Sequence, residues 1–225
     1  IFKFIGFAIF PIYAHIFSVS DYGRMELVGS FAMFIGLFIN MGMNNAVQRF
    51  YWDPGIEENQ RPVLVSSGFW VLVAWAILLA FISLSGFHFL RHFIQSKYQI
   101  PFLFLLLALL TNIFTQFVQF CLDVLRLHFS PWKFTLLSSL KNLIGVFLGL
   151  YLILVMKQGL SGFFYGGLIA SILIVPFGIW LIRKDFVFKI NPDFCKELVK
   201  FGYPFVFAGL AYWLFGTIDR WILGT

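Results

Sequence analysis

The feature that most constrains this chain is a repeated pattern of long apolar runs separated by short polar stretches. The fullest example is residues 18–52, where a polar turn at Asp21, Tyr22 and Gly23 precedes an apolar run. That run closes in a polar cluster made of Asn44, Asn45, Gln48 and Arg49. About 20 helical residues, at about 1.5 Å rise each, cross the hydrocarbon core of a bilayer. The pattern therefore predicts a bundle of membrane-spanning helices.

Composition excludes several classes of protein. Charged residues make up 12% of the chain and mean hydropathy is +0.90, whereas about a quarter of the residues of a soluble domain are charged. The net charge of +6 is dispersed between apolar runs, which argues against nucleic acid as a partner. Cys121 and Cys195 lie in different segments, so we expect no disulfide and no metal site. Motifs of soluble enzymes are missing, and we predict no catalytic role and no cofactor.

The apolar runs predict an all-α polytopic membrane protein with six transmembrane helices and part of a seventh. We expect spans at residues 1–17, 25–46, 62–86, 101–122, 134–156 and 160–182, with the seventh starting near residue 202. Polar connectors are expected at 51–61, 87–99 and 125–133, and a short amphipathic interfacial helix at 191–201. The chain lacks an initiator methionine and both its ends are apolar, so we expect it to be a fragment of a longer protein.

Basic residues predict the orientation. The connectors after the second, fourth and sixth spans hold nine Lys and Arg, against four in the other connectors. Because cytoplasmic loops carry an excess of Lys and Arg, we expect a multi-pass protein of the plasma (inner) membrane with a cytoplasmic N-terminus.

Polar residues inside the spans are the candidate functional groups. In the fourth span they recur at helical spacing and share one stripe: Asn112, Gln116, Gln119, Asp123 and Arg126. One interpretation is a wall of a hydrophilic cavity that opens to the cytoplasm, and the other is hydrogen bonding between tightly packed helices. The number of polar groups favours the cavity.

Further candidates lie at the ends of other spans. Asn44, Asn45 and Arg49 close the second span, and Lys141 lies near the start of the fifth, where a solvated or snorkelling helix end is the alternative. Asp219 and Arg220 lie in the seventh span, either as an anion contact by Arg220 or as a structural ion pair.

Several stretches together resemble a known family. FSVSDYGRMELVGSF and GMNNAVQRFYWD, followed by QGLSGFFYGGLIASI and FGYPFVFAGLAYWLFGTIDRWILG, resemble the polysaccharide-transporter branch of the multidrug/oligosaccharidyl-lipid/polysaccharide (MOP) flippase superfamily. The resemblance covers nearly the whole chain. It implies a MATE-like helical bundle with an N-terminal lobe at 1–182, a cytoplasmic connector at 183–201, and the start of a second lobe at 202–225.

The resemblance also implies a function. Such proteins are alternating-access transporters that move lipid-linked oligosaccharides, such as O-antigen repeat units on undecaprenyl pyrophosphate, to the outer leaflet. Membrane lipids and the machinery for glycan polymerisation and export would be partners. Arg49, Arg126, Lys141 and Arg220 would supply positive charge for phosphates, and the Asn and Gln side chains would face sugars. The alternatives are a cation-coupled multidrug exporter and a membrane-embedded acyl- or glycosyltransferase.

Overall fold

The computed structural model describes the backbone of residues 11–98 and 100–223, and the side chains of residues 11–87 and 100–216. The described residues are 84% helical and contain no strand. The helices are α2 Val19–Asn40, α3 Met43–Tyr51, α4 Arg61–Tyr98, α5 Phe102–Leu127, α6 Pro131–Leu154, α7 Leu160–Leu181, α8 Pro192–Gly202 and α9 Pro204–Leu223, with a 3-10 turn at Glu58–Gln60. Residues 11–16 are also helical.

The fold class predicted from the sequence is confirmed. Within the described residues, six segments are long and apolar enough to cross a membrane, and they correspond to the second to seventh expected spans. The first expected span lies mostly in residues 1–10, which are outside the described residues.

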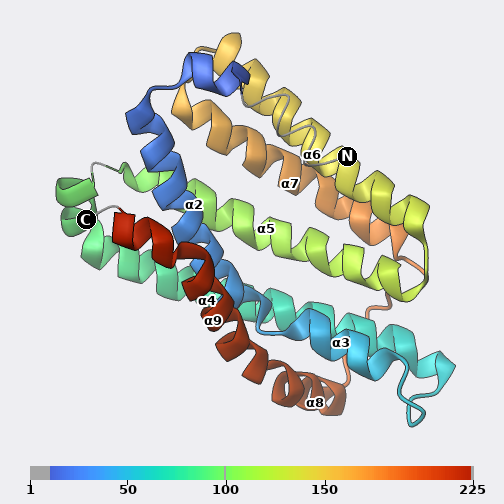
Figure 1. Ribbon diagram of the computed structural model, residues 1–225. Coiled ribbons are helices and arrows are strands. Elements are labelled where there is room, and N and C mark those ends of the chain that lie inside the picture. The colour runs from blue at the N-terminus through green and yellow to red at the C-terminus, as the bar shows by residue number, and fades with distance from the viewer. Residues whose placement is uncertain (1–10, 99, 224–225) are drawn as a thin grey trace.

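Helix α5 lies at the centre of the bundle. It contacts α2, α3, α4, α6 and α7, and its side chains Leu109, Val118, Phe120 and Cys121 are almost fully buried. Figure 1 shows α6 and α7 as a close pair on one side of α5, with α3 and α8 at one end of the bundle. Helix α5 is therefore in contact with five other helices.

The predicted turn at Asp21, Tyr22 and Gly23 is wrong. These residues belong to the first turn of α2, which begins at Val19. Ser18 caps the helix, because its Oγ accepts from the Asp21 backbone N–H at 3.2 Å and donates to the Asp21 carboxylate at 2.7 Å. A Ser followed three residues later by an acidic residue forms a capping box, and this local signal outweighs the turn preference of Gly23.

The second predicted span is also not continuous. The helix breaks at Met41 and Gly42, whose φ angles are 47° and 66°, and α3 continues as a separate helix. Gly42 packs against the backbone of Gly202, the last residue of α8, and a Cβ at Gly42 would lie 2.3 Å from the Gly202 carbonyl oxygen. Glycine satisfies both the left-handed conformation and this close approach. The polar cluster from Asn44 to Arg49 thus lies on α3.

Two predicted connectors are shorter than expected. Helix α4 continues through most of the predicted connector 87–99 as far as Tyr98, because the sequence places no proline between Pro62 and Pro101. The basic connector 125–133 narrows to residues 128–130, between the end of α5 and Pro131 at the start of α6. Arg126 is therefore on a helix.

Two further features fix the positions of helices in the bundle. Gly149 and Gly166 allow close packing of α6 on α7, since a Cβ at Gly166 would lie 2.5 Å from the backbone of Gly149. Asn191 caps α8 by accepting from the Asp193 backbone N–H at 2.9 Å. In α8 the apolar Leu198 is buried, while Lys196 and Lys200 are exposed.

Candidate functional site

The polar stripe of α5 faces α2 and α3. Asn112 donates to the Ala32 carbonyl oxygen at 2.6 Å, and Gln116 accepts from Asn40 at 3.1 Å. A Cβ at Gly36 would lie 2.8 Å from the Asn112 side chain, so glycine at this position makes room for the amide. The N-terminal part of the stripe, Asn112 and Gln116, therefore holds α2 against α5 through interhelical hydrogen bonds.

Asp123 is the centre of the C-terminal part of the stripe, between Gln119 and Arg126. It is 5% exposed, and its carboxylate accepts from Asn44 on α3 at 2.7 Å, from Gln119 at 3.2 Å and from Arg126 at 3.0 Å. A buried carboxylate requires such donors, because an uncompensated charge in an apolar environment is costly. The Asn44–Asp123 bond joins α3 to α5, whereas the other two bonds lie within α5.

These contacts bear on the two interpretations of the stripe. Asn112, Gln116 and Asp123 all take part in bonds between helices, as the packing interpretation requires. Asn112 also lines a cavity, as the alternative requires. The stripe thus combines the two features, and the binding of substrate by its members stays a prediction.

Two arginines near the α3 end of the bundle are exposed, and each forms an ion pair with an aspartate. The Arg49 and Arg126 side chains are each 58% exposed. Arg49 contacts Asp53 at 3.3 Å, and Arg126 contacts Asp123 and stacks over Phe134, with its guanidinium carbon 4.7 Å from the ring centre. Each guanidinium has five N–H donors, so these contacts leave donor capacity for an anion.

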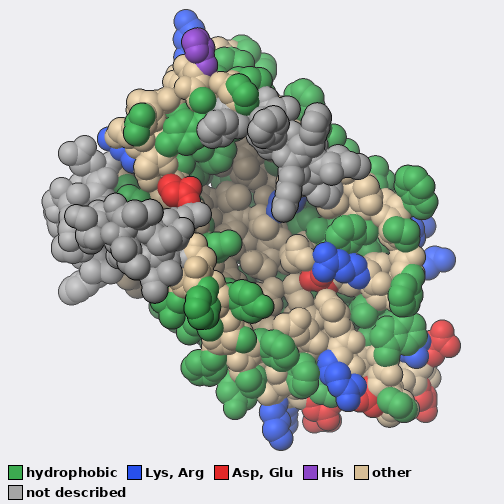
Figure 2. Space-filling model, viewed as in Figure 1, with side chains coloured by type: hydrophobic (Ala, Val, Ile, Leu, Met, Phe, Trp, Pro, Cys, Tyr) green, Lys and Arg blue, Asp and Glu red, His purple; other side chains and the backbone are tan. Residues whose placement is uncertain are grey.

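A cavity of about 410 Å³ lies between α2, α5, α6 and α7, with Tyr13 at its edge. Figure 2 shows the face of the molecule hollowed at its centre, between α2 and the α6–α7 pair. Most of the lining is apolar, including Val28, Phe163 and Phe164. The polar lining groups come mainly from α5 and α6, with Ser171 from α7.

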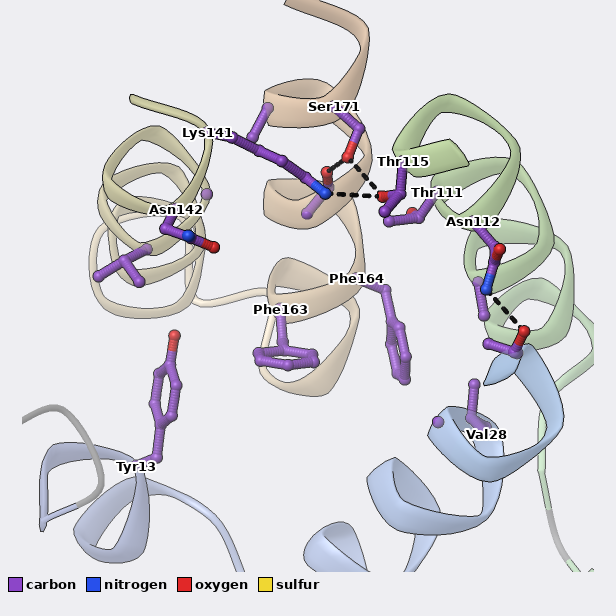
Figure 3. Close-up of a pocket in the computed structure, with 17 residues that line it drawn as sticks. Tyr13, Val28, Thr111, Asn112, Thr115, Lys141, Asn142, Phe163, Phe164 and Ser171 are labelled. Atoms are coloured by element: carbon purple, nitrogen blue, oxygen red, sulfur yellow. Dashed lines mark hydrogen bonds between the residues drawn. The ribbon is translucent and has the colours of Figure 1, made fainter. Parts of the chain in front are cut away.

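Lys141 is the charged group of this cavity. Its ammonium reaches from α6 to α5 and donates to Thr115 Oγ1 at 3.1 Å (Figure 3). Thr115 in turn lies 3.3 Å from the hydroxyl of Ser171 on α7. Among the described residues that line the cavity there is no carboxylate. The ammonium is thus bound by a neutral hydroxyl and can interact with an anionic or hydroxyl-rich ligand.

The structure joins some of the predicted residues and separates others. Asn44, Gln119, Asp123 and Arg126 form one hydrogen-bonded cluster, and Asn112 lines the same cavity as Lys141. Asn45, next to Asn44, is exposed and lies outside this cluster. The side chains of Asp219 and Arg220 lie outside the described residues.

Sequence reasoning missed four participants. They are Tyr13, Asn40, Thr115 and Ser171. Asn40 lies four residues before Asn44 in an apolar run, and this spacing could have extended the polar patch by one helical turn. Single hydroxyl groups such as Thr115 and Ser171 are common in membrane helices, and nothing in their spacing marks them.

The sequence matches the model of a known protein family. The model of the family described as "Polysaccharide biosynthesis protein" matches residues 1–225, the whole of the chain. The chain belongs to the polysaccharide biosynthesis protein family. This family comprises the polysaccharide and O-antigen flippases of the MOP superfamily. No curated protein and no solved structure matches the chain.

Membership in the polysaccharide biosynthesis protein family supports a flippase-type transporter in a polysaccharide pathway. The family is generally non-enzymatic. Together with the six membrane-type segments, it indicates a multi-pass membrane protein that acts on polysaccharide precursors and contacts membrane lipids.

Proposed function

We propose that the protein moves a lipid-linked oligosaccharide from the cytoplasmic to the outer leaflet by alternating access. The observation that carries the proposal is Lys141, a cationic side chain held by Thr115 inside a cavity between apolar helices. A charge within the membrane is costly and usually marks a path for a substrate or an ion. In a family of polysaccharide flippases, an anionic glycolipid is the substrate that this charge fits best.

The substrate we propose is of the undecaprenyl-pyrophosphate type. Its phosphates require cations, and Arg49, Arg126, Lys141 and Arg220 are the candidates. Arginine binds phosphate through two parallel hydrogen bonds, whereas lysine acts as a point charge. The amides of Asn44, Asn45, Asn112, Gln116 and Gln119 would contact sugar hydroxyls, and the glycan polymerase and export machinery would receive the product.

The direction of transport follows from the proposed orientation. Nine Lys and Arg in or near the connectors on one side, against four on the other, support a cytoplasmic position for the α3 and α8 end. Arg49 and Arg126 would then meet the substrate first, and Lys141 would lie further along its path. In this proposal residues 1–182 form one lobe, 183–201 connect it, and 202–225 begin the lobe that moves against it.

A cation-coupled drug exporter fits the structure less well. Such a transporter needs an acidic side chain that is free to bind a cation. In the described part of the membrane segments the buried carboxylate is Asp123, and Asn44, Gln119 and Arg126 already donate to it. This arrangement favours a structural or coupling role for Asp123 within a flippase.

The proposal is tested by glycan export in cells that depend on the complete protein. We expect Lys141→Gln, Arg126→Ala and Arg220→Ala each to abolish surface glycan and to accumulate lipid-linked repeat units, with normal amounts of protein in the membrane. Lys157→Gln is the control for the same loss of charge, since Lys157 is exposed in the turn after α6. Normal export by the three variants would refute the assigned site.

A further inference from the structure

A second cleft, of about 370 Å³, lies beside the connector between α5 and α6 and next to the C-terminal end of α7. It is separate from the Lys141 cavity and shares none of its lining residues. Its polar lining consists of His128, Ser130, Lys133, Arg183, Lys184 and Asp185. A site for one water needs only about 10–15 Å³, so the cleft has room for a ligand group.

Three of the lining residues are cations without a carboxylate partner. Within the described residues, no Asp or Glu lies within ion-pair distance of Lys133, Arg183 or Lys184. The one acidic residue of the described lining, Asp185, contacts groups other than these three cations. Its carboxylate lies 2.8 Å from His128 Nε2 and accepts from the Tyr51 hydroxyl at 3.3 Å. The cleft therefore has a net positive charge even with His128 neutral.

The His128–Asp185–Tyr51 contacts also give the cleft a fixed shape. Tyr51 Oη lies 3.2 Å from His128 Nε2 as well, so the three side chains contact one another. They come from the end of α3, the α5–α6 connector and the segment after α7. Because each of these segments is tied to the other two, the basic residues are held on a preorganised surface.

Exposed aromatic side chains line the cleft or adjoin its lining residues in sequence. Trp180 lines it, and the Arg183 guanidinium lies 5.3 Å from the Trp180 ring centre. Phe129 and Trp132, on the connector and first turn of α6, are 84% and 86% exposed. Trp and other aromatic residues at the ends of membrane helices lie at the level of lipid headgroups. The cleft is therefore placed where phosphates of the bilayer surface are found.

We propose that this cleft binds the phosphate of an anionic phospholipid headgroup, with Lys133, Arg183 and Lys184 as its ligands. The three cations supply charge and hydrogen bonds to the phosphate oxygens, and Trp180 lies beside the glycerol and acyl chains. The site does not depend on the proposed transport function, since the ligand need not cross the membrane.

The test is binding of a fluorescent short-chain phosphatidylglycerol to the purified complete protein in neutral detergent, measured by anisotropy. Phosphatidylcholine, which lacks net charge, is the reference lipid. Each cation near a membrane surface contributes about fivefold in affinity for anionic lipid. We expect Lys133→Gln/Arg183→Gln/Lys184→Gln to weaken phosphatidylglycerol binding at least tenfold, and Lys184→Gln alone about fivefold. Binding of phosphatidylcholine should be unchanged in both variants.

The matched control is Lys189→Gln/Lys196→Gln/Lys200→Gln, which removes three exposed cations outside the cleft and should change binding less than twofold. Inorganic phosphate is the competitor that separates the two sources of the anion. Weak competition at millimolar concentration supports a lipid ligand, whereas tight phosphate binding that the triple variant loses would replace the lipid by soluble phosphate. Equal losses in the two triple variants, or none in either, would overturn the site.

Discussion

The buried bond between Asn44 and Asp123 permits a sharp test of how α3 is held to α5. Asn44→Asp replaces the donating amide group with an oxygen of similar size, 2.7 Å from the Asp123 carboxylate. Asn45→Asp makes the same chemical change on the next residue, whose side chain is exposed. Any difference between the two variants therefore reports the environment of Asn44.

The expected magnitude follows from the contacts. The lost hydrogen bond contributes about 1 kcal/mol. Two unit charges about 4 Å apart repel by about 4 kcal/mol at an effective dielectric constant near 20. Arg126, 3.0 Å from Asp123 and largely exposed, offsets part of this repulsion. We expect Asn44→Asp to lower the free energy of unfolding by about 3 kcal/mol and Asn45→Asp by less than about 0.5 kcal/mol.

Thermal unfolding of the complete protein in detergent measures this difference. A loss of 1 kcal/mol shifts Tm by about 2–4 °C in a chain of 150–250 residues and by less in a longer one, so Asn44→Asp should lower the Tm of the complete protein by several degrees. Asn44→Asp/Asp123→Asn restores one carboxylate and one amide with their roles exchanged, and should recover at least half of the loss. Equal Tm values for Asn44→Asp and Asn45→Asp, or no recovery in the double variant, would refute the reasoning.

Two further predictions concern close backbone contacts. Gly166→Val should destabilise the α6–α7 pair by about 3 kcal/mol or more, because its Cβ would lie 2.5 Å from the backbone of Gly149. Gly167→Ala, whose Cβ would lie 3.7 Å from the nearest side chain, is the control in the same melting assay, and equal losses would contradict this packing. Gly42→Ala should reduce the yield of folded protein, because it combines a φ of 66° with a clash against Gly202. Normal yield and Tm for Gly42→Ala would show that the α2–α3 break is not as described.

The membrane-spanning pattern could be predicted because it depends on length and hydropathy alone. The spans were placed by apolar runs of about 20 residues, and the short helix predicted at 191–201 corresponds to α8. The errors fell where local signals conflict. Gly23 suggested a turn although Ser18 and Asp21 form a capping box, and the break at Gly42 depends on Gly202, which is 160 residues away in sequence.

The candidate site was only partly predictable for a related reason. Helical spacing found the stripe from Asn112 to Arg126, because those residues share one face of one helix. Spacing within a helix cannot show which helix that face meets, so the partners Asn40 and Ala32 were not foreseen. The placement of Lys141 beside Thr115 also depends on how α6 packs on α5, which is a tertiary property.

The proposed transport is tested most directly in proteoliposomes that contain the complete protein and a fluorescent undecaprenyl-pyrophosphate-linked oligosaccharide. A membrane-impermeant quencher reports the fraction of glycan on the outer surface. We predict that the protein raises the rate at which enclosed glycan becomes accessible, that Lys141→Gln abolishes this increase, and that Lys157→Gln retains it. Equal rates in vesicles with and without the protein would contradict the proposed function.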